Sequence, residues 1–368
     1  MAEQKIQMEM NDHPYQNGLI YAAVSIGGGY AVRKYIIDNN TYFESNYAFY
    51  NVLFHYYQIA TNVEGLHFDI QRATSAIAFG RQKDKFISTL KRVFDLLFHD
   101  SYNAVLFEKA KEMAKKAFAA RYKDGAFRAK YKGFEISELN KHFSLEQLTY
   151  DIENITFEMF IASVRTLLVS DNICVYILGD TKDLDFSTIS FEGYDKRFDH
   201  MVRLGGIGYD PYLREDVHIV SIARKNYNFM IEAFDFLNPK VTNFTKQLIV
   251  ELSAEMIPAS EIDSWVDSFD ASILFFDEQL RSYKEDLISY SEPIYNEAHQ
   301  NLKIKYATLL ENSPEIFAVK AANLMTVGIY IDQYLSFLDT CSYETFREVC
   351  AKADYKITEA QVVLRKEH

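Results

Sequence analysis

An internal repeat constrains the fold of this chain more than any other feature of its sequence. In the first half, a helix pattern that starts after Thr156 leads into an apolar strand pattern, Ile173–Leu178. In the second half, a helix pattern that starts after Ser342 leads into another, Ala360–Leu364. Thr and Ser favour the N-cap because their hydroxyl accepts a hydrogen bond from the first helical turn. Such duplication predicts two copies of one structural unit.

The segments upstream of these closing strands also correspond. Each half shows two successive helix patterns, with apolar residues three and four positions apart. Pro293 lies in the first turn of the last of them, where a missing backbone N–H is tolerated. The helices are expected at Asp84–Phe98 and Ala104–Tyr122 in the first half, and at Glu278–Tyr290 and Pro293–Glu311 in the second.

Two strand patterns precede the helices in each half. The chain has 368 residues, a length that favours two domains. We therefore expect an α+β fold of two tandem homologous domains, each a mostly antiparallel sheet packed with helices. The domains are expected at 1–180 and 199–368 with a linker at 181–198, and the opening strands at Lys5–Met10, Leu19–Ile26, Asp216–Ala223 and Tyr227–Phe236.

The distribution of charge bears on possible partners. The formal net charge is −13, and residues 181–368 hold 31 Asp and Glu against 19 Lys and Arg. An acidic surface repels a phosphate backbone, so no nucleic-acid partner is expected. Residues 109–132 form a local basic run with interleaved aromatics. This run is typical of a solvated helix face, and a contact patch for an acidic partner is the alternative.

Three features indicate a cytoplasmic protein. The sequence lacks an apolar run of about 18 residues, so no membrane-spanning helix is expected. Met1–Asp12 lacks the apolar core of a secretory signal. Cys174, Cys341 and Cys350 show no CxxC spacing and are expected to be free, mostly buried thiols of a reducing compartment.

The duplicated unit resembles that of the M16 peptidases of the pitrilysin and insulinase type, in particular their shorter bacterial M16B-like branch. The segment Asp171–Asp180 is similar to the closing strand of their first domain, and the helices at 104–122 and 293–311 occupy corresponding places. The resemblance implies the M16 metallopeptidase-like fold. The chemistry of that family uses His-x-x-Glu-His on a helix, in which the histidines bind zinc and the glutamate activates the zinc-bound water.

The helix at the place of this motif is Ser45–Tyr57, and it carries a degenerate version. Aligned on the motif, Asn51 stands at the first histidine and Phe54 at the general base. His55 alone is retained, at the second histidine. On an aromatic helix, an isolated histidine is expected to be a hydrogen-bonded core or cavity residue and not a metal ligand.

The other positions that the resemblance assigns are also altered. The third zinc ligand of the family is a glutamate; counting seven residues on from Glu108 gives Lys115, whose positive charge would repel zinc. In the second domain, an arginine and a tyrosine of the family help to hold the scissile carbonyl, and Ser253 and Ser260 lie near their places. One imidazole cannot supply three zinc ligands, so no catalytic residue, metal or cofactor is expected.

Other candidate features point to structural roles. Gly27–Gly29 lacks the lysine and hydroxyl residue of a phosphate loop and is expected to end a strand in a turn. The aromatic residues of 42–57 and 227–236 are expected in the core, with the lining of a peptide chamber as the alternative. The cysteines have no adjacent histidine to activate a nucleophile.

The resemblance implies a non-catalytic subunit of a heterodimeric zinc peptidase. M16 peptidases enclose peptides in a chamber of four such domains, so a two-domain chain needs a second chain. An active M16 partner would hold the zinc while this chain helps to enclose and bind a peptide, such as a small bacterial peptide or a bacteriocin precursor. The alternative is a scaffold protein of the same fold, as a homodimer or in a larger assembly, without a peptidase role. An enzyme with a relocated site is a third possibility.

Overall fold

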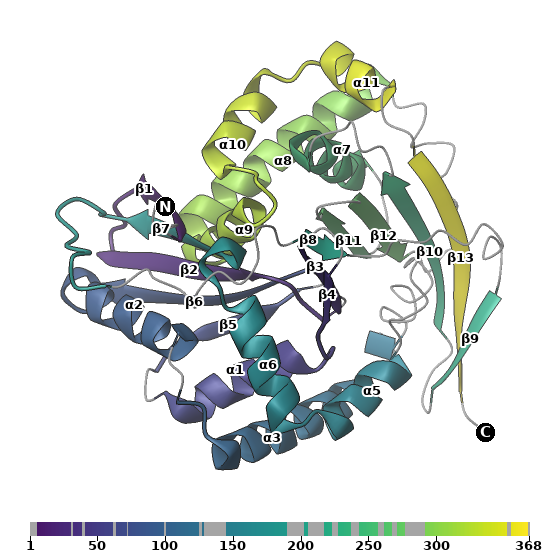
Figure 1. The fold of residues 1–368 in the computed structure, drawn as a ribbon. Helices are drawn as coiled ribbons and strands as arrows, with labels where there is room; N and C mark the ends of the chain where they lie inside the picture. Colours follow the sequence, from purple (N-terminus) through teal and green to yellow (C-terminus); the bar gives the residue numbers. More distant parts are fainter. Residues whose placement is uncertain are drawn as a thin grey trace. The chain divides into compact units, whose positions relative to one another are not determined.

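The computed structural model divides the chain into two units, each built from separate segments of the sequence (Figure 1). Both units contain residues from both halves of the repeat. Unit 1 comprises Met1–Lys116, Tyr150–Leu204 and Tyr306–Ile331, and unit 2 comprises Ala117–Thr149, Gly205–Lys305 and Asp332–His368. The structure describes residues 6–30, 32–38, 41–61, 64–71, 73–98, 101–124, 127–128, 145–189, 202–204, 217–222, 227–236, 243–256, 261–266, 271–276, 291–351 and 355–366.

Unit 1 contains a five-stranded sheet in the order β1-β7-β2-β6-β5. β1 runs parallel to β7, and every other neighbouring pair is antiparallel. The first strand of this sheet, β1, therefore lies beside its last strand in the sequence, β7, and β2 occupies the centre. The strands are β1 Gln7–Asp12, β2 Leu19–Gly27, β5 His67–Ile70, β6 Thr74–Gln82 and β7 Ile173–Gly179.

Unit 2 contains a second five-stranded sheet, β9-β13-β10-β12-β11, that repeats the first strand for strand. β9 runs parallel to β13, and the remaining pairs are antiparallel. The same order with the same directions in both sheets confirms an α+β fold of two tandem homologous units. The strands are β9 Val217–Ile222, β10 Tyr227–Phe236, β11 Glu261–Val266, β12 Ala271–Phe276 and β13 Tyr355–Lys366.

The remaining elements are a small sheet in unit 1 and the helices. In the small sheet, β3 (Lys34–Asp38) pairs antiparallel with both β4 (Thr41–Glu44) and β8 (Val202–Leu204). The helices discussed below are α1 Phe49–Ala60, α2 Lys83–Phe98, α3 Ala104–Tyr122, α5 Leu145–Asn154, α6 Phe157–Leu167, α7 Asn243–Met256, α8 Glu292–Asn312, α9 Pro314–Met325, α10 Ile331–Thr340 and α11 Tyr343–Ala351.

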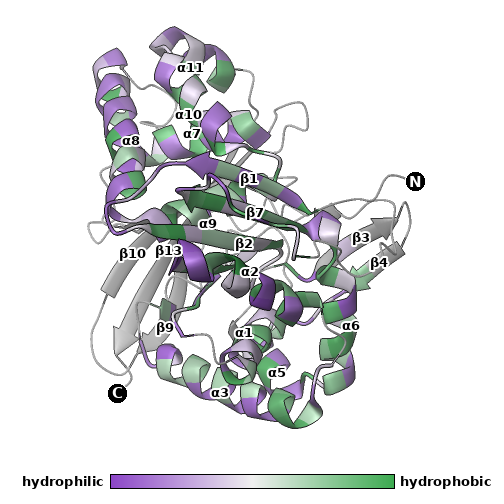
Figure 2. Ribbon diagram, turned by 90° about the vertical axis from the view of Figure 1, so that its left-hand side faces the viewer, coloured by the Kyte–Doolittle hydropathy of each residue, from purple (hydrophilic) through white to green (hydrophobic). Residues whose placement is uncertain are grey.

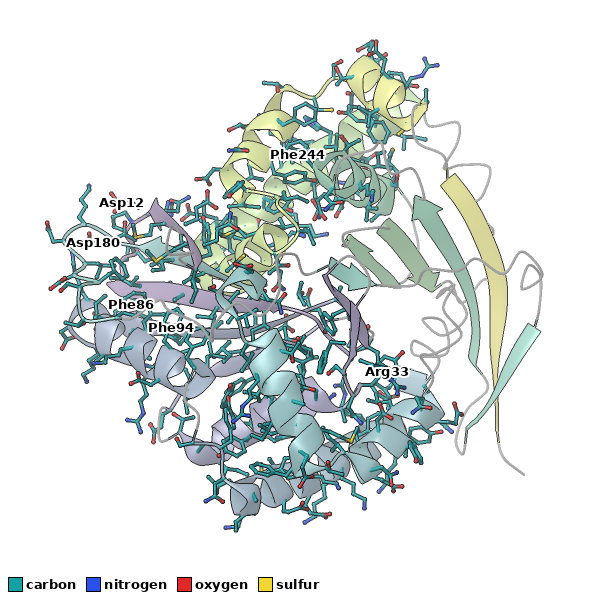
Figure 3. All side chains as sticks on the ribbon, in the orientation of Figure 1. Asp12, Arg33, Phe86, Phe94, Asp180 and Phe244 are labelled. Atoms are coloured by element: carbon teal, nitrogen blue, oxygen red, sulfur yellow. The ribbon has the colours of Figure 1, made fainter. Side chains whose placement is uncertain are left out.

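Helices cover both faces of the first sheet, which explains why its central strands are apolar almost throughout (Figure 2). On one face, Phe86 of α2 lies against Phe79 of β6, with ring centroids 5.6 Å apart. Phe86 and Phe94 extend from α2 on this side (Figure 3), and both are buried. The apolar positions of α2 therefore form one wall of the core of unit 1.

The helix on the opposite face, α9, comes from the second half of the chain. It packs on β2, β6 and β7, where the small side chains of Ala23 and Ala78 allow a close approach. The Ser25 hydroxyl donates to Asn323 Oδ1 at 2.5 Å in this buried contact. A buried polar pair penalises other registers, because a shift of the helix leaves both groups unpaired. The sheet of the first half is thus completed by a helix of the second.

Most of the expected elements agree with the structure. α3 and β10 begin and end at the expected residues. Both expected N-caps are confirmed: Thr156 Oγ1 accepts the Met159 N–H at 3.2 Å, and Ser342 Oγ accepts the Thr345 N–H at 3.2 Å. The helix expected at Glu278–Tyr290 lies outside the described residues.

Several expected boundaries are shifted, and the domain limits stay a prediction. The first strand runs from Gln7 to Asp12 instead of Lys5–Met10. The limits at 180 and 199 describe the sequence repeat, whereas the spatial units exchange segments between the halves. Among the described residues, no helix is long and apolar enough to cross a membrane.

Candidate functional site

The N-terminus of α1 is fixed by two side chains, which explains where the helix begins. Asn46 Oδ1 accepts the Ala48 N–H at 2.8 Å, and Asp151 Oδ2 of α5 accepts the Tyr47 N–H at 2.9 Å. The helix expected from Ser45 therefore starts at Phe49, because the preceding residues form a hydrogen-bonded turn. The Asp151 carboxylate also carries the charge that a helix N-terminus favours.

Asn51 and His55 lie one helical turn apart on the partly exposed side of α1. Seven of the 12 residues of this helix are buried, so this stripe is the side from which a site could be formed. The structure therefore brings together the two positions aligned with the zinc-binding histidines. An amide and an imidazole occupy them.

The imidazole of His55 is held by its own helix. Its Nδ1 lies 2.8 Å from Gln58 Oε1. Because an amide oxygen accepts hydrogen bonds, Nδ1 is the donor in this pair. His55 is thus hydrogen-bonded, as expected, but it lies on the partly exposed side of α1 and not in the core. Sequence reasoning missed Gln58 as the partner, although a spacing of three residues places both side chains on one helix face.

Phe54 points into the core. Only 3% of its surface is exposed, and its ring centroid lies 5.0 Å from that of Phe68 on β5. A general base at this position would have to be a carboxylate in contact with another aromatic ring, at a large desolvation cost. The position aligned with the general base has therefore become part of the hydrocarbon core.

Lys115 lies on the exposed side of α3, as does Glu108. The buried side of this helix consists of Phe107, Ala110 and Ala114. None of the described interactions joins Lys115 to α1. The residues aligned with the three zinc ligands are thus an amide, one imidazole and a solvated ammonium group, which do not fit zinc. Within the described ranges, no group of three or more His, Cys, Asp or Glu could hold a metal ion.

The corresponding helix of unit 2, α7, is a core element. Ser253 is 5% exposed, and Ser260 lies outside the described residues. Glu251 is buried on the same helix and accepts the Tyr334 hydroxyl of α10 at 2.6 Å. These polar groups satisfy one another inside unit 2, which is a structural role.

The turn at Gly27–Gly29 ends β2, as expected. Gly28 has φ +132°, and a Cβ there would lie 2.2 Å from Tyr50 Oη. Its N–H donates to Ala73 O at 2.8 Å, and its carbonyl accepts the Ser75 hydroxyl at 2.9 Å. Because this backbone is already bonded within the fold, the structure favours a turn over a phosphate loop.

The cysteines are free thiols, as the sequence predicts. Cys174 and Cys341 are buried. Burial also raises the pKa of the Cys350 thiol to about 12. A thiol with such a pKa is almost entirely protonated near neutral pH, so it is a poor nucleophile.

Comparison with known proteins identifies the fold. No family model matches the sequence, and no curated protein matches it. A protein described as an M16-like peptidase, from Alicyclobacillus acidocaldarius, shares 10% identity at a TM-score of 0.71, over 97% of this chain and 95% of that one.

Two further solved structures show the same fold in other settings. A chain of Complex III2 from Candida albicans shares 14% identity at a TM-score of 0.60, over 96% of this chain and 92% of that one. The periplasmic protease PqqL from Escherichia coli shares 8% identity at a TM-score of 0.59, over 99% of this chain and 47% of that one. The chain therefore has the M16-like peptidase fold.

Proposed function

We propose that this chain is the non-catalytic subunit of a two-chain zinc peptidase, in which a partner of the same fold holds the metal. The observation that carries the proposal is the composition of α1. Its partly exposed stripe offers Asn51 and His55, and Phe54 is buried against Phe68. Water activation by zinc needs three protein ligands and a base, and these residues supply one imidazole.

The size of the chain, compared with the longer PqqL, supports a partner of the same fold. The chain matches 47% of the length of PqqL, so it corresponds to about half of that protease. Two such chains would supply the number of units that a single longer chain contains. The partner in this proposal is a catalytically active M16 peptidase chain, and both are bacterial proteins of the cytoplasm.

The peptide-binding part of the proposal rests on β5. This strand ends the sheet order in unit 1, and it lies beside α1 through the Phe54–Phe68 contact. An end strand can add an extended peptide through its outer N–H and C=O groups. An extended segment bound there would lie beside the helix that carries Asn51 and His55.

Coexpression with a chain that carries an intact His-x-x-Glu-His motif tests this proposal. We expect a 1:1 complex by light scattering, with chelator-sensitive peptidase activity above that of either chain alone. His55→Ala in this chain should leave the zinc content of the complex unchanged, whereas Glu→Gln in the motif of the partner should abolish activity. If no motif-bearing chain from the same genome forms a complex, the proposal fails.

A scaffold role is the second candidate, because one structure of this fold is a chain of Complex III2. In this case the chain would assemble as a homodimer or in a larger complex without peptidase activity. A stable assembly that lacks any motif-bearing chain would favour this role over the first.

A further inference from the structure

Asp69 of β5 lies on the face of the sheet on which α9 packs. In the register of the sheet, Asp69 is opposite Ala76, and Ala76 is opposite Ser25, which contacts α9. Side chains alternate between the two faces of a strand. Phe68 accordingly points to the other face, toward α1, where it contacts Phe54. β5 thus presents a carboxylate on one face and an aromatic ring on the other.

The carboxylate of Asp69 has a hydrogen-bond donor but no paired lysine or arginine among the described residues. Gln71 Nε2 donates to Asp69 Oδ2 at 2.7 Å, and the other described group that affects its ionisation is His67 of the same strand. Burial raises the pKa of Asp69 more than these two groups lower it, although the residue is partly exposed. A cation beside this carboxylate would meet a charge that water screens only in part.

The backbone groups of β5 show which residues a further strand would contact. The Gln71 N–H donates to Thr74 O at 2.9 Å. Hydrogen-bonded pairs alternate with non-hydrogen-bonded pairs along an antiparallel ladder. In the register of β5 and β6, the N–H and C=O of Asp69 therefore face β6, whereas those of Phe68 and Ile70 face the outer edge. An extended peptide can hydrogen-bond to these outer groups.

A peptide that runs antiparallel to β5 places one residue opposite Asp69. This residue occupies a non-hydrogen-bonded pair, in which the Cα atoms lie about 4.5 Å apart and the side chains are closest. Its side chain lies on the same face as the Asp69 carboxylate. We propose that β5 selects peptides with a lysine or arginine at this position. The peptide residues on either side are opposite Phe68 and Ile70, so an apolar–basic–apolar segment fits the strand. This inference rests on the peptide-binding role proposed above for β5.

Labelled peptides test the selection with the full chain alone. Three short peptides of alternating valine and threonine differ in one central residue between two valines, which is lysine, glutamine or glutamate. Fluorescence anisotropy measures their dissociation constants. The lysine peptide should bind about five-fold more tightly than the glutamine peptide, and the glutamate peptide should bind most weakly. The preference for lysine should decrease as pH falls through the raised pKa of Asp69, because the protonated carboxyl has no charge.

Asp69→Asn is the matched variant, because its amide oxygen can still accept from Gln71 while the charge is removed. It should bind the glutamine peptide as the wild type does and lose the preference for lysine. Asp69→Lys should reverse the preference toward glutamate. Asp12→Asn on β1, at the other end of the sheet, is the control and should keep the preference for lysine. Melting curves check that each variant is folded.

Methylation of single peptide amides tests the pairing on the wild-type chain and needs no variant. In the proposed register, the residues next to the central lysine direct their N–H groups toward β5, whereas the backbone N–H of the lysine points away. Methylating a neighbouring amide should therefore weaken binding more than methylating the amide of the lysine.

Three results would overturn the inference. The wild type could bind the three peptides equally, or bind none of them below about 1 mM. Asp69→Asn could keep the preference for lysine. The two methylated peptides could bind equally well. None of these results bears on the complex with a motif-bearing chain, so failure of this inference and failure of the proposed function are distinguishable.

Discussion

Helices α1 and α7 occupy corresponding places in the two halves, between the second strand of each sheet and the strand pair that follows. They differ in burial. α1 leaves Asn51 and His55 on a partly exposed stripe. α7 buries every residue from Lys246 to Ser253, including the charged Lys246 and Glu251. A helix that is exposed on one side can present a site, whereas one buried on all sides supports a core. The corresponding helix thus lies partly at the surface in unit 1 and in the core in unit 2.

The largest effect is expected from the buried side of α1. Phe54→Ala should lower the free energy of unfolding by about 3–4 kcal/mol, because it leaves a cavity against Phe68. Asn51→Ala, on the exposed stripe of the same helix, should change it by less than about 0.5 kcal/mol. Urea denaturation measures both. Equal effects of the two substitutions on the free energy of unfolding would show that α1 does not have one buried and one partly exposed side.

A slightly smaller loss is expected in α7. Glu251→Ala removes the acceptor of the Tyr334 hydroxyl inside unit 2 and should cost about 2–3 kcal/mol. Glu255→Ala is the control on the same helix, since its carboxylate pairs with Lys305 nearer the surface and should cost less than about 1 kcal/mol. A loss below 1 kcal/mol for Glu251→Ala would contradict the description of α7 as a core helix.

The strand beside α1 gives a test by pH. Burial raises the pKa of Asp69 on β5, and the Gln71 side chain, which donates to it at 2.7 Å, opposes the shift. The folded state thus holds this proton more tightly than the unfolded state, so its contribution to stability is largest at acid pH. That contribution is lost as pH rises through the raised pKa. Asp69→Asn should therefore gain stability relative to the wild type between pH 3 and pH 7, as melting temperatures would show; a constant difference would mean that β5 is solvated.

The smallest effect is expected at His55. His55→Ala removes the hydrogen bond to Gln58 at the protein surface and should change the free energy of unfolding by less than about 0.5 kcal/mol. A loss above about 1.5 kcal/mol would place His55 in the core and remove the difference between the two sides of α1.

Much of the fold could be predicted because its signals are local. The limits of α3 follow from apolar residues three and four positions apart, and Thr156 and Ser342 mark helix starts through their own hydroxyl groups. The repeat in the sequence then predicts that the two halves form similar sheets, even though the pairing of the strands cannot be predicted. These features depend on residues close together in the sequence.

The parts that sequence reasoning missed depend on contacts between distant residues. α9 packs on the sheet of the first half. The residues of Pro314–Met325 carry no signal that indicates which sheet this helix packs on. The start of α1 depends on Asp151, which lies about a hundred residues downstream. Likewise, the polar residues of α7 give no periodic signal that would distinguish a core helix from a surface helix.

Metal content tests the central claim most directly, namely that α1 cannot support zinc chemistry. The purified chain should be incubated with zinc, freed of excess metal by desalting, and examined by elemental analysis and by peptide hydrolysis with and without a chelator. We expect far less than one zinc per chain and no chelator-sensitive hydrolysis. About one zinc per chain, together with hydrolysis that a chelator abolishes, would contradict the account.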